Sequence, residues 1–218
     1  MESVEDKIIP NNNSYLVKDD IIKLLSDNKL HIIPLLDNSQ ISEVSVDFRL
    51  GYDFLVSIQG REAFINASKN DAEINKNQRN INQFFQATRR QIGETFILHP
   101  HQTVLAVSLE YVKLPQDCLL KLSMRSSYSR LGITISTMAQ PGYCGCLSIE
   151  LTNNNNNPIN LTVGSRIMQG IFFRVSSASE YFSKNRKYIC QVRPEPSAII
   201  NDKDLDILNE LWKENNNK

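Results

Sequence analysis

A short run of arginines and serines, RSSYSR at 125–130, combines fixed positive charge with hydroxyl groups. Arg125 and Arg130 can each offer a planar guanidinium to phosphate oxygens in bidentate fashion. Ser126 and Ser127 follow an apolar run and can begin a helical turn whose free N–H groups face an anion. Ser126 and Arg130 are four residues apart, so they would share one side of that turn. The stretch predicts a phosphate-binding turn, and a capped surface turn with exposed arginines is the alternative.

A second chemical group, Glu150, stands in the apolar run CLSIELTN. If this run is a strand, alternation places Cys146, Ser148 and Glu150 on one face and three aliphatic residues on the other. Burial of the first face would disfavour a charged carboxylate, raise the pKa of Glu150 and suit it for proton transfer near neutral pH. If that face is in solvent, Glu150 is simply an exposed surface acid.

The charges of the chain balance, with 24 basic and 24 acidic residues. Non-specific nucleic-acid binding depends on surplus positive charge, so we expect no nucleic-acid partner and only a local anion site. The sequence shows neither an apolar run of spanning length nor a signal-peptide layout at its beginning, so we expect a cytoplasmic protein without membrane contact.

The sequence also argues against zinc chemistry. Zinc-dependent nucleobase deaminases use an H-x-E motif with P-C-x-x-C to activate water, and the three histidines here are not followed by such a pattern. We interpret the four scattered cysteines as structural thiols; they are Cys118, Cys144, Cys146 and Cys190.

These groups need a frame, and the sequence predicts a mainly β one. Apolar spacing predicts a helix within 15–30, and alternation predicts a strand over 45–58. Residues 60–93 are polar and are interpreted as an insertion, partly helical. From residue 96 onward short β-rich runs alternate with turn residues, which is typical of a β-sandwich or barrel. One run, ITISTMA at 133–139, is expected as a single strand.

The remaining segments are more polar. NNNNNP at 153–158 predicts a solvated hairpin loop. After residue 177 the strand pattern stops, and 178–218 is interpreted as a tail that orders on another surface and ends in a short amphipathic helix. We therefore expect one domain over 1–218, with a peripheral insertion and a tail.

Together these stretches resemble the dCTP deaminase branch of the dUTPase superfamily. The resemblance is carried by RSSYSRLG, PGYCGCLSIEL and GSRIMQGIFFRVSS, and extends to SVDFRLGYDF, FILHPHQTVLAVSLEYVKLP and KYICQVRPEPS. It covers most of 15–200 in the order that the family shows. It implies a dUTPase-like β-barrel or sandwich (a β-clip) and a homotrimer, or a higher oligomer, with active sites shared between subunits.

The resemblance also implies roles for individual residues. Glu150 would be the general acid/base, with Ser126 and Arg130 holding the water and the cytosine. The residues implied in substrate binding are Arg125, Ser127, Gln140, Ser148, Tyr181, Lys187 and Gln191, the last three on a tail that closes over the site. Magnesium would accompany the triphosphate as its counter-ion and would not be the hydrolytic metal.

The implied activity is hydrolytic deamination of dCTP to dUTP and ammonia, which supplies dUTP for dUMP and dTMP synthesis. One alternative is dUTP hydrolysis to dUMP, alone or after deamination; another is a nucleotide-binding or regulatory protein without turnover. Many family members carry Asp immediately before Pro-Gly, where this chain has Gln140. Gln140 can hydrogen-bond a 3′-hydroxyl but cannot act as a base, which disfavours dUTP hydrolysis.

Overall fold

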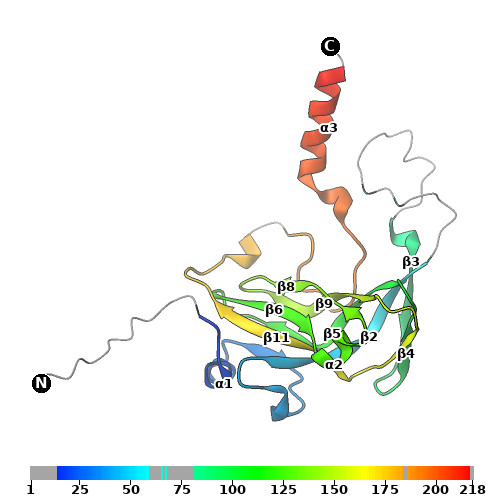
Figure 1. Cartoon of the computed structure of the whole chain (residues 1–218). Helices are drawn as coiled ribbons and strands as arrows, with labels where there is room; N and C mark the ends of the chain where they lie inside the picture. The colour runs from blue at the N-terminus through cyan, green and yellow to red at the C-terminus, as the bar shows by residue number, and fades with distance from the viewer. Residues whose placement is uncertain (1–13, 59–64, 66, 68–80, 184–185, 217–218) are drawn as a thin grey trace, which may run out of the picture.

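The computed structural model describes residues 14–58, 65, 67, 81–183 and 186–216. Within them, antiparallel strands dominate, so the expected mainly β class is confirmed (Figure 1). The larger sheet contains β1 (His31–Ile33), β2 (Val46–Ser57), β3 (Phe85–Arg89), β5 (Thr103–Lys113), β6 (Cys118–Met124), β7 (Ile133–Thr134), β8 (Thr137–Ala139), β9 (Cys144–Asn153) and β11 (Arg166–Arg174). The smaller sheet pairs β4 (Thr95–Leu98) with β10 (Ile159–Thr162).

The long strand β2 bends the larger sheet. Its first half pairs with β11, and its second half pairs with β3 and β5, with a register shift between Leu50 and Phe54. Gly51 lies at this bend, where a Cβ would be 2.6 Å from the carbonyl oxygen of Val107, so only glycine fits without a shift of backbone. The strand order is β7-β9-β5-β2-β11-β6-β8, and the curl brings its far end, β8, back beside β9.

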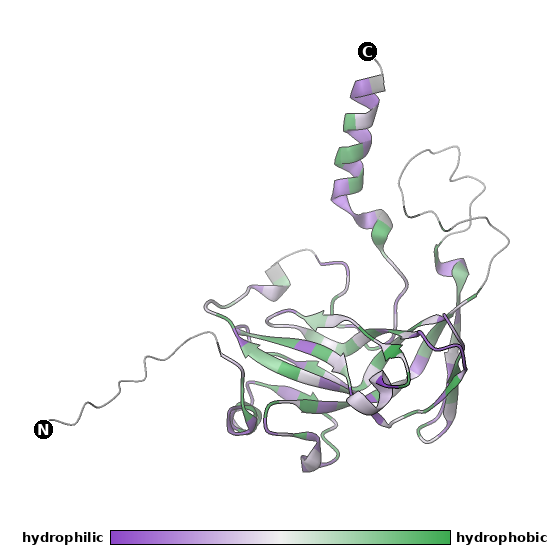
Figure 2. Cartoon of the chain, viewed as in Figure 1, coloured by the Kyte–Doolittle hydropathy of each residue, from purple (hydrophilic) through white to green (hydrophobic). Residues whose placement is uncertain are grey.

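The core fills the inside of this curl. Along β9 the predicted alternation is confirmed, because residues 147, 149 and 151 are buried and face the core. Phe48 and Phe54 of β2 are buried, and the Phe54 ring stacks on Phe96 of β4 with the ring centres 4.1 Å apart. Figure 2 shows hydrophobic and hydrophilic residues alternating along the strands. Burial of this aliphatic and aromatic surface supplies the main stabilising free energy of the fold.

The structure corrects two expectations about loops and strands. The run 133–139 forms two short strands, β7 on β9 and β8 on β6, instead of one. The segment 153–158 is not a hairpin loop, because β9 and β10 belong to different sheets. Asn153 is fully buried and donates from Nδ2 to the carbonyl oxygens of Leu98 and Asn157 at 3.0 and 2.9 Å. An asparagine-rich composition predicted the loop but could not predict which strands it connects.

A third correction concerns the polar insertion. The last part of the expected 60–93 segment belongs to the sheet, since residues 85–89 form β3 on the edge of β2. Most of the rest of that segment lies outside the described residues.

The described chain contains three α-helices and several single-turn 3₁₀ helices. The predicted first helix is α1 (Lys18–Ser26), where Asp20 Oδ2 accepts from the backbone N–H of Val17 at 3.2 Å. The short helix α2 (Ser126–Ser129) follows β6, and α3 (Lys203–Asn216) ends the chain and projects away from the sheets in Figure 1. The single-turn 3₁₀ helices are η1 (Asn38–Gln40), η3 (Ile81–Phe84), η4 (Tyr181–Ser183) and η5 (Ile199–Asn201). Among the described residues, no helix has the length and apolarity needed to cross a bilayer.

Candidate active site

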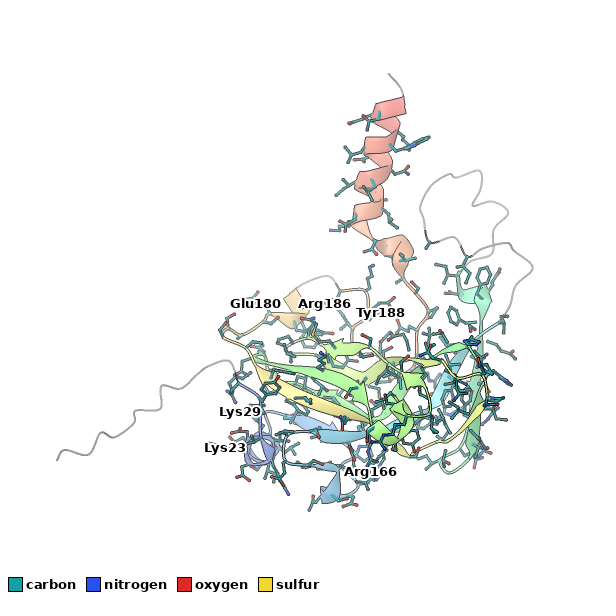
Figure 3. The ribbon with its side chains drawn as sticks, viewed as in Figure 1. Lys23, Lys29, Arg166, Glu180, Arg186 and Tyr188 are labelled. Carbon is teal, nitrogen blue, oxygen red and sulfur yellow. The ribbon has the colours of Figure 1, made fainter. Side chains whose placement is uncertain are left out.

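A cleft of about 750 Å³ opens between β8, β9 and the C-terminal tail. Most of the predicted site residues line it; they are Gln140, Ser148, Glu150, Tyr181, Lys187 and Gln191. The cleft exists because the curl of the sheet brings β8 beside β9 and because the tail crosses the gap. Figure 3 shows Arg186 and Tyr188 of this tail above the strand edges. Phe85, Leu105 and Met138 add apolar wall, a surface suited to the flat ring of a base.

Glu150 is the acid that β9 turns into the cleft. Its carboxyl oxygen Oε2 accepts a hydrogen bond from Thr137 Oγ1 of β8 at 3.4 Å. In the single chain the side chain is exposed at the cleft mouth, yet the surrounding atoms desolvate it and raise its pKa, an effect that the bond from Thr137 partly opposes. Both sequence interpretations are thus partly right, since the face is solvent-accessible while the carboxyl environment favours the protonated form.

The tail is fixed to β9 by main-chain and aromatic contacts. The carbonyl oxygen of Gln191 accepts from the backbone N–H of Cys146 at 2.7 Å, four residues along β9 from Glu150. Tyr181 is buried and meets the edge of Tyr143 with ring centres 6.0 Å apart. These contacts hold the tail over the cleft within one chain.

One amide in the cleft has no acceptor. Gln191 is 5% exposed, and its Nε2 has no hydrogen-bond partner among the residues that the structure describes. A buried donor without an acceptor costs about 1–3 kcal/mol, so this group is suited to bind an acceptor on a ligand.

Cations of the tail also face the cleft. The Arg186 guanidinium lies 4.4 Å from the centre of the Tyr181 ring, in a cation–π contact. Lys187 Nζ forms an ion pair with Asp202 Oδ1 at 2.6 Å, just before α3. Sequence analysis did not single out Arg186, Tyr143 or Thr137, because nothing local in the sequence shows that these segments meet.

The arginine–serine turn is confirmed as a helix, but it lies outside this cleft. Ser126 and Ser127 are exposed on α2, and Arg130 is exposed directly after it. The backbone N–H of Arg125, the residue before α2, donates to the carbonyl oxygen of Ile167 at 2.9 Å. Neither Arg125 nor any of these three residues lines the cleft that contains Glu150. Within one chain, the predicted site residues therefore fall into two groups, one that lines the cleft and one at α2 that does not.

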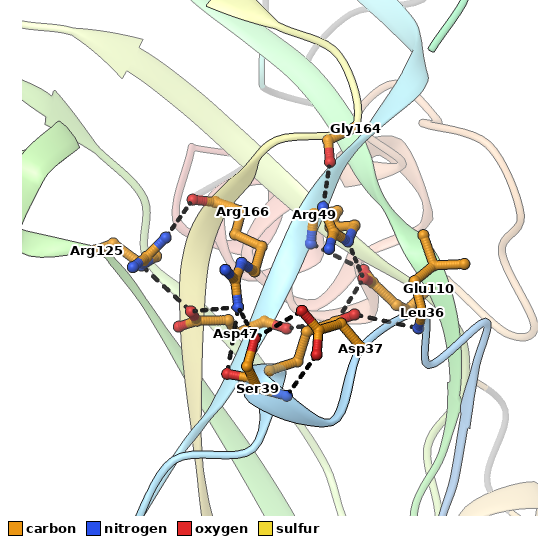
Figure 4. A network of polar contacts seen from close by, with 10 residues as sticks. Leu36, Asp37, Ser39, Asp47, Arg49, Glu110, Arg125, Gly164 and Arg166 are labelled. Atoms are coloured by element: carbon orange, nitrogen blue, oxygen red, sulfur yellow. Dashed lines mark hydrogen bonds and ion pairs between the residues drawn. The ribbon is translucent and has the colours of Figure 1, made fainter. Parts of the chain in front are cut away.

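Beside this turn lies a partly buried polar network (Figure 4). Arg125 Nε is 3.4 Å from Asp47 Oδ2, and Arg166 Nη1 is 3.9 Å from the same oxygen. Glu110 is fully buried and accepts from the backbone N–H of Arg49 at 2.9 Å and from Gln40 Nε2 at 3.1 Å. Burial raises the pKa of Glu110 to about 7, although these hydrogen bonds and the Arg49 charge lower it.

Sequence analysis missed Glu110, although the signal that singled out Glu150 applies to it equally. Both acids stand in apolar strand runs, SLEYV and LSIELT. The structure separates their roles, because Glu150 faces a cleft that a ligand can enter and Glu110 faces only protein.

The four cysteines are free thiols. Among the described residues, no group of three or more His, Cys, Asp or Glu side chains is arranged to hold a metal ion.

Known proteins resemble this chain over most of its length. The family model described as "dCTP deaminase-like" matches residues 15–175. A protein of Methanobrevibacter smithii named "dCTP deaminase, dUMP-forming" is 33% identical over 198 residues, which is 87% of this chain and 98% of the relative. A protein of Natronomonas pharaonis named "dCTP deaminase" is 32% identical and covers 85% of this chain and 95% of the relative.

Among solved structures, a 2′-deoxycytidine 5′-triphosphate deaminase from Agrobacterium tumefaciens superimposes with a TM-score of 0.56 at 23% identity. The match covers 75% of this chain and about half, 48%, of that one. This likeness confirms the fold that the sequence resemblance implied.

Proposed function

The chain belongs to the dCTP deaminase-like family, and from this membership and the cleft we propose that it is an enzyme that deaminates dCTP, bound as its magnesium complex, to dUTP and ammonia. The product would feed dUMP and dTMP synthesis. The observation that carries the proposal is the position of Glu150, whose carboxyl faces a cleft lined by hydrogen-bonding groups and closed by a tail.

Glu150 would act as the general acid/base. As a carboxylate it takes a proton from a water molecule, and the resulting hydroxide adds to C4 of the cytosine. Glu150 gives that proton to N3, which completes a tetrahedral intermediate. It then transfers the proton of the new C4 hydroxyl to the amino group, and the C4–N bond breaks as the C4 carbonyl forms, which releases ammonia. A carboxyl group with a raised pKa suits this cycle, because it must exist in both forms near neutral pH. Hydrogen bonding from Thr137 holds the carboxyl in place.

Substrate binding would use the remaining cleft residues. Ser148, next to Glu150 on the same strand face, and the free Nε2 of Gln191 can bind the pyrimidine or its phosphates. Lys187 would exchange its partner Asp202 for a phosphate. Gln140 is at the cleft edge, where its amide can hydrogen-bond the 3′-hydroxyl.

The missing half of the site would come from a neighbouring subunit. Arg125, Ser126, Ser127 and Arg130 are outside the cleft of their own chain, and Ser126, Ser127 and Arg130 are exposed. In a homotrimer, α2 of one subunit would meet the Glu150 cleft of the next. There Arg125 and Ser127 would bind the phosphates, and Ser126 and Arg130 would hold the water and the cytosine.

A second candidate is the formation of dUMP. The M. smithii relative carries a dUMP-forming name, which favours hydrolysis of the triphosphate after deamination. Against it, an attacking water needs a base near the α-phosphate, and the residue before Pro141 is Gln140, which cannot accept that proton. We therefore place dUTP formation first.

The test is a product assay. Purified protein is incubated with dCTP and Mg²⁺, and separately with dUTP and Mg²⁺, while ammonia and pyrophosphate are measured. Ammonia without pyrophosphate supports the first candidate, and pyrophosphate with ammonia supports the second. Nucleotide binding without either product would contradict both and leave a binding protein.

A further inference from the structure

Arg125, the residue before α2, pairs with a carboxylate on strand β2 (Figure 4). Asp47 of β2 places Oδ2 3.4 Å from Arg125 Nε, and Arg125 Nη1 donates to the carbonyl oxygen of Arg166 at 3.1 Å. The Asp47 side chain is 10% exposed and that of Arg125 is 38% exposed. One edge of the guanidinium is therefore anchored to protein while the rest of the group reaches solvent.

The backbone of Asp47 is held by neighbouring elements on both sides. It lies in a strand between other strands, with its backbone opposite Gln169 of β11. Its carbonyl oxygen accepts from Gln40 Nε2 at 3.0 Å, which fixes the strand from its other side. A side chain on such a backbone has few positions available, so its carboxylate defines one direction for the arginine above it.

The anchor matters because an arginine side chain is long and flexible. Confining it costs rotamer entropy, and a site that has already confined it binds its ligand more tightly. Arg125 has five N–H donors in its side chain. Nη1 donates to the Arg166 carbonyl oxygen and Nε faces Asp47, so other donors remain for phosphate oxygens. Arg166 shares Asp47 at 3.9 Å, so the carboxylate also reduces repulsion between two neighbouring guanidinium groups.

We infer that Asp47 is a positioning residue for the triphosphate: it orients Arg125 so that the exposed edge of the guanidinium meets the phosphates. This inference rests on the proposed function, in which Arg125 binds phosphate. It assigns to the SVDFRLG stretch the task of holding the phosphate-binding arginine of a different segment.

The competing interpretation is that Asp47 only neutralises buried positive charge and stabilises the fold. The two interpretations predict different effects of Asp47 removal on nucleotide affinity when Arg125 is also replaced. If Asp47 acts through Arg125, its removal has no effect on nucleotide affinity once the guanidinium is gone. A purely structural Asp47 would lower stability, and affinity with it, whichever residue stands at position 125.

The experiment is a double-mutant cycle on the affinity for magnesium dCTP, measured by calorimetry, with thermal unfolding recorded for each protein. The variants are Asp47→Asn, Arg125→Gln and the pair, with Asp117→Asn as the matched control. Asp117 pairs with Arg174 at 2.9 Å at the other end of β6, so it tests loss of a similar ion pair away from the turn. Deoxycytidine, which has no phosphate, is the second ligand.

We expect Asp47→Asn to weaken dCTP binding about tenfold and deoxycytidine binding hardly at all. In the Arg125→Gln background the Asp47 change should have no further effect, and Asp117→Asn should bind like the wild type. In turnover, Asp47→Asn should raise KM for dCTP about tenfold with kcat nearly unchanged. Unchanged or tighter dCTP binding, or an equal loss in both backgrounds, would overturn the inference.

Failure of the proposed function has a different signature. If Arg125→Gln itself leaves dCTP affinity unchanged, Arg125 does not bind phosphate. In that case the role that the proposed function gives to Arg125 is wrong, whatever Asp47 does. If Arg125→Gln weakens binding and Asp47→Asn does not, only the positioning role fails. Should Asp47→Asn not fold, Arg125→Lys replaces it, because lysine keeps the charge but lacks the N–H that faces Asp47. Wild-type affinity in Arg125→Lys would then overturn the inference.

Discussion

The carbonyl oxygen of Gln191 accepts a hydrogen bond from the backbone N–H of Cys146 at 2.7 Å, so the C-terminal tail is attached to the strand that carries Glu150. Gly145, the residue before, has a φ of 148°, and a Cβ there would lie 2.8 Å from that same oxygen. Glycine at this position permits the close approach of tail and strand. The position of the tail over the cleft therefore depends on this backbone hydrogen bond as well as on side-chain contacts.

Replacing Gly145 with alanine should detach the tail from β9. The added methyl group cannot fit beside Gln191, so we expect kcat/KM for dCTP to fall roughly ten- to hundredfold as the cover is misplaced. Limited proteolysis should cut more rapidly within 181–197. Gly93→Ala is the control, because Gly93 also has a positive φ of 90° but nothing lies within 4 Å of its added Cβ. Equal effects of the two changes would show that backbone strain, and not the tail, is responsible.

Glu150→Gln should abolish turnover while dCTP affinity stays within about tenfold of the wild type, because the amide keeps the shape but cannot accept the proton of water. Single-turnover assays and calorimetry measure the two effects separately. Glu43→Gln, a change of an exposed acid paired with Lys18, is the control for loss of one negative charge. Deamination by Glu150→Gln near the wild-type rate would refute the assignment of the base.

Two inactive variants should restore activity to each other if sites are shared between subunits. Glu150→Gln lacks the acid/base, and the second variant is Ser126→Ala. In mixed oligomers formed by co-expression, some sites combine an intact Glu150 with an intact Ser126. Ammonia release from the mixture, compared with each variant alone, is the measurement. Mixed oligomers without activity would mean that one chain supplies both groups.

The stability of the protein should decrease as the pH rises through the range in which Glu110 ionises. Its pKa is raised from 4.5 to about 7 when the protein folds. Below pH 4.5 both states hold the proton and above pH 7 neither does, so between these values the folded state retains a proton that the unfolded state has lost. The contribution of Glu110 to the free energy of unfolding should fall by about 2–3 kcal/mol from pH 5 to pH 8.

Urea unfolding of the wild type and Glu110→Gln at both pH values measures this change. The stability of the variant relative to the wild type should rise by that amount between pH 5 and pH 8, because glutamine does not titrate. A difference that is the same at both pH values would show that Glu110 does not change its protonation on folding.

Much of the fold could be predicted from local patterns. Alternation along 144–153 specified a strand and its buried face, and it did so because side chains of a strand point to opposite sides whatever its neighbours are. Spacing predicted α1, and serine following an apolar run predicted the turn at α2. The asparagine-rich segment shows the limit, since its composition predicted a loop and not the burial of Asn153.

Within the site, the sequence indicated which side chains could do chemistry, but not which of them meet. SLEYV and LSIELT are nearly equivalent as sequence patterns. Only the packed structure shows that Glu110 is fully buried by protein and that Glu150 lines an open cleft. The pairing of Asp47 with Arg125 joins strand β2 to the residue before α2, far along the sequence, and nothing in either segment specifies it.

By itself, then, the sequence determined the β class, the chemical groups available and the family resemblance, because these depend on residue type and on the period of the backbone. The tertiary structure decided that the tail covers Glu150, that the residues of α2 do not line the same cleft and that a buried carboxylate holds Arg125. The physical reason is that burial and contact depend on how a bent sheet closes, and many residues far apart in the chain determine that closure together.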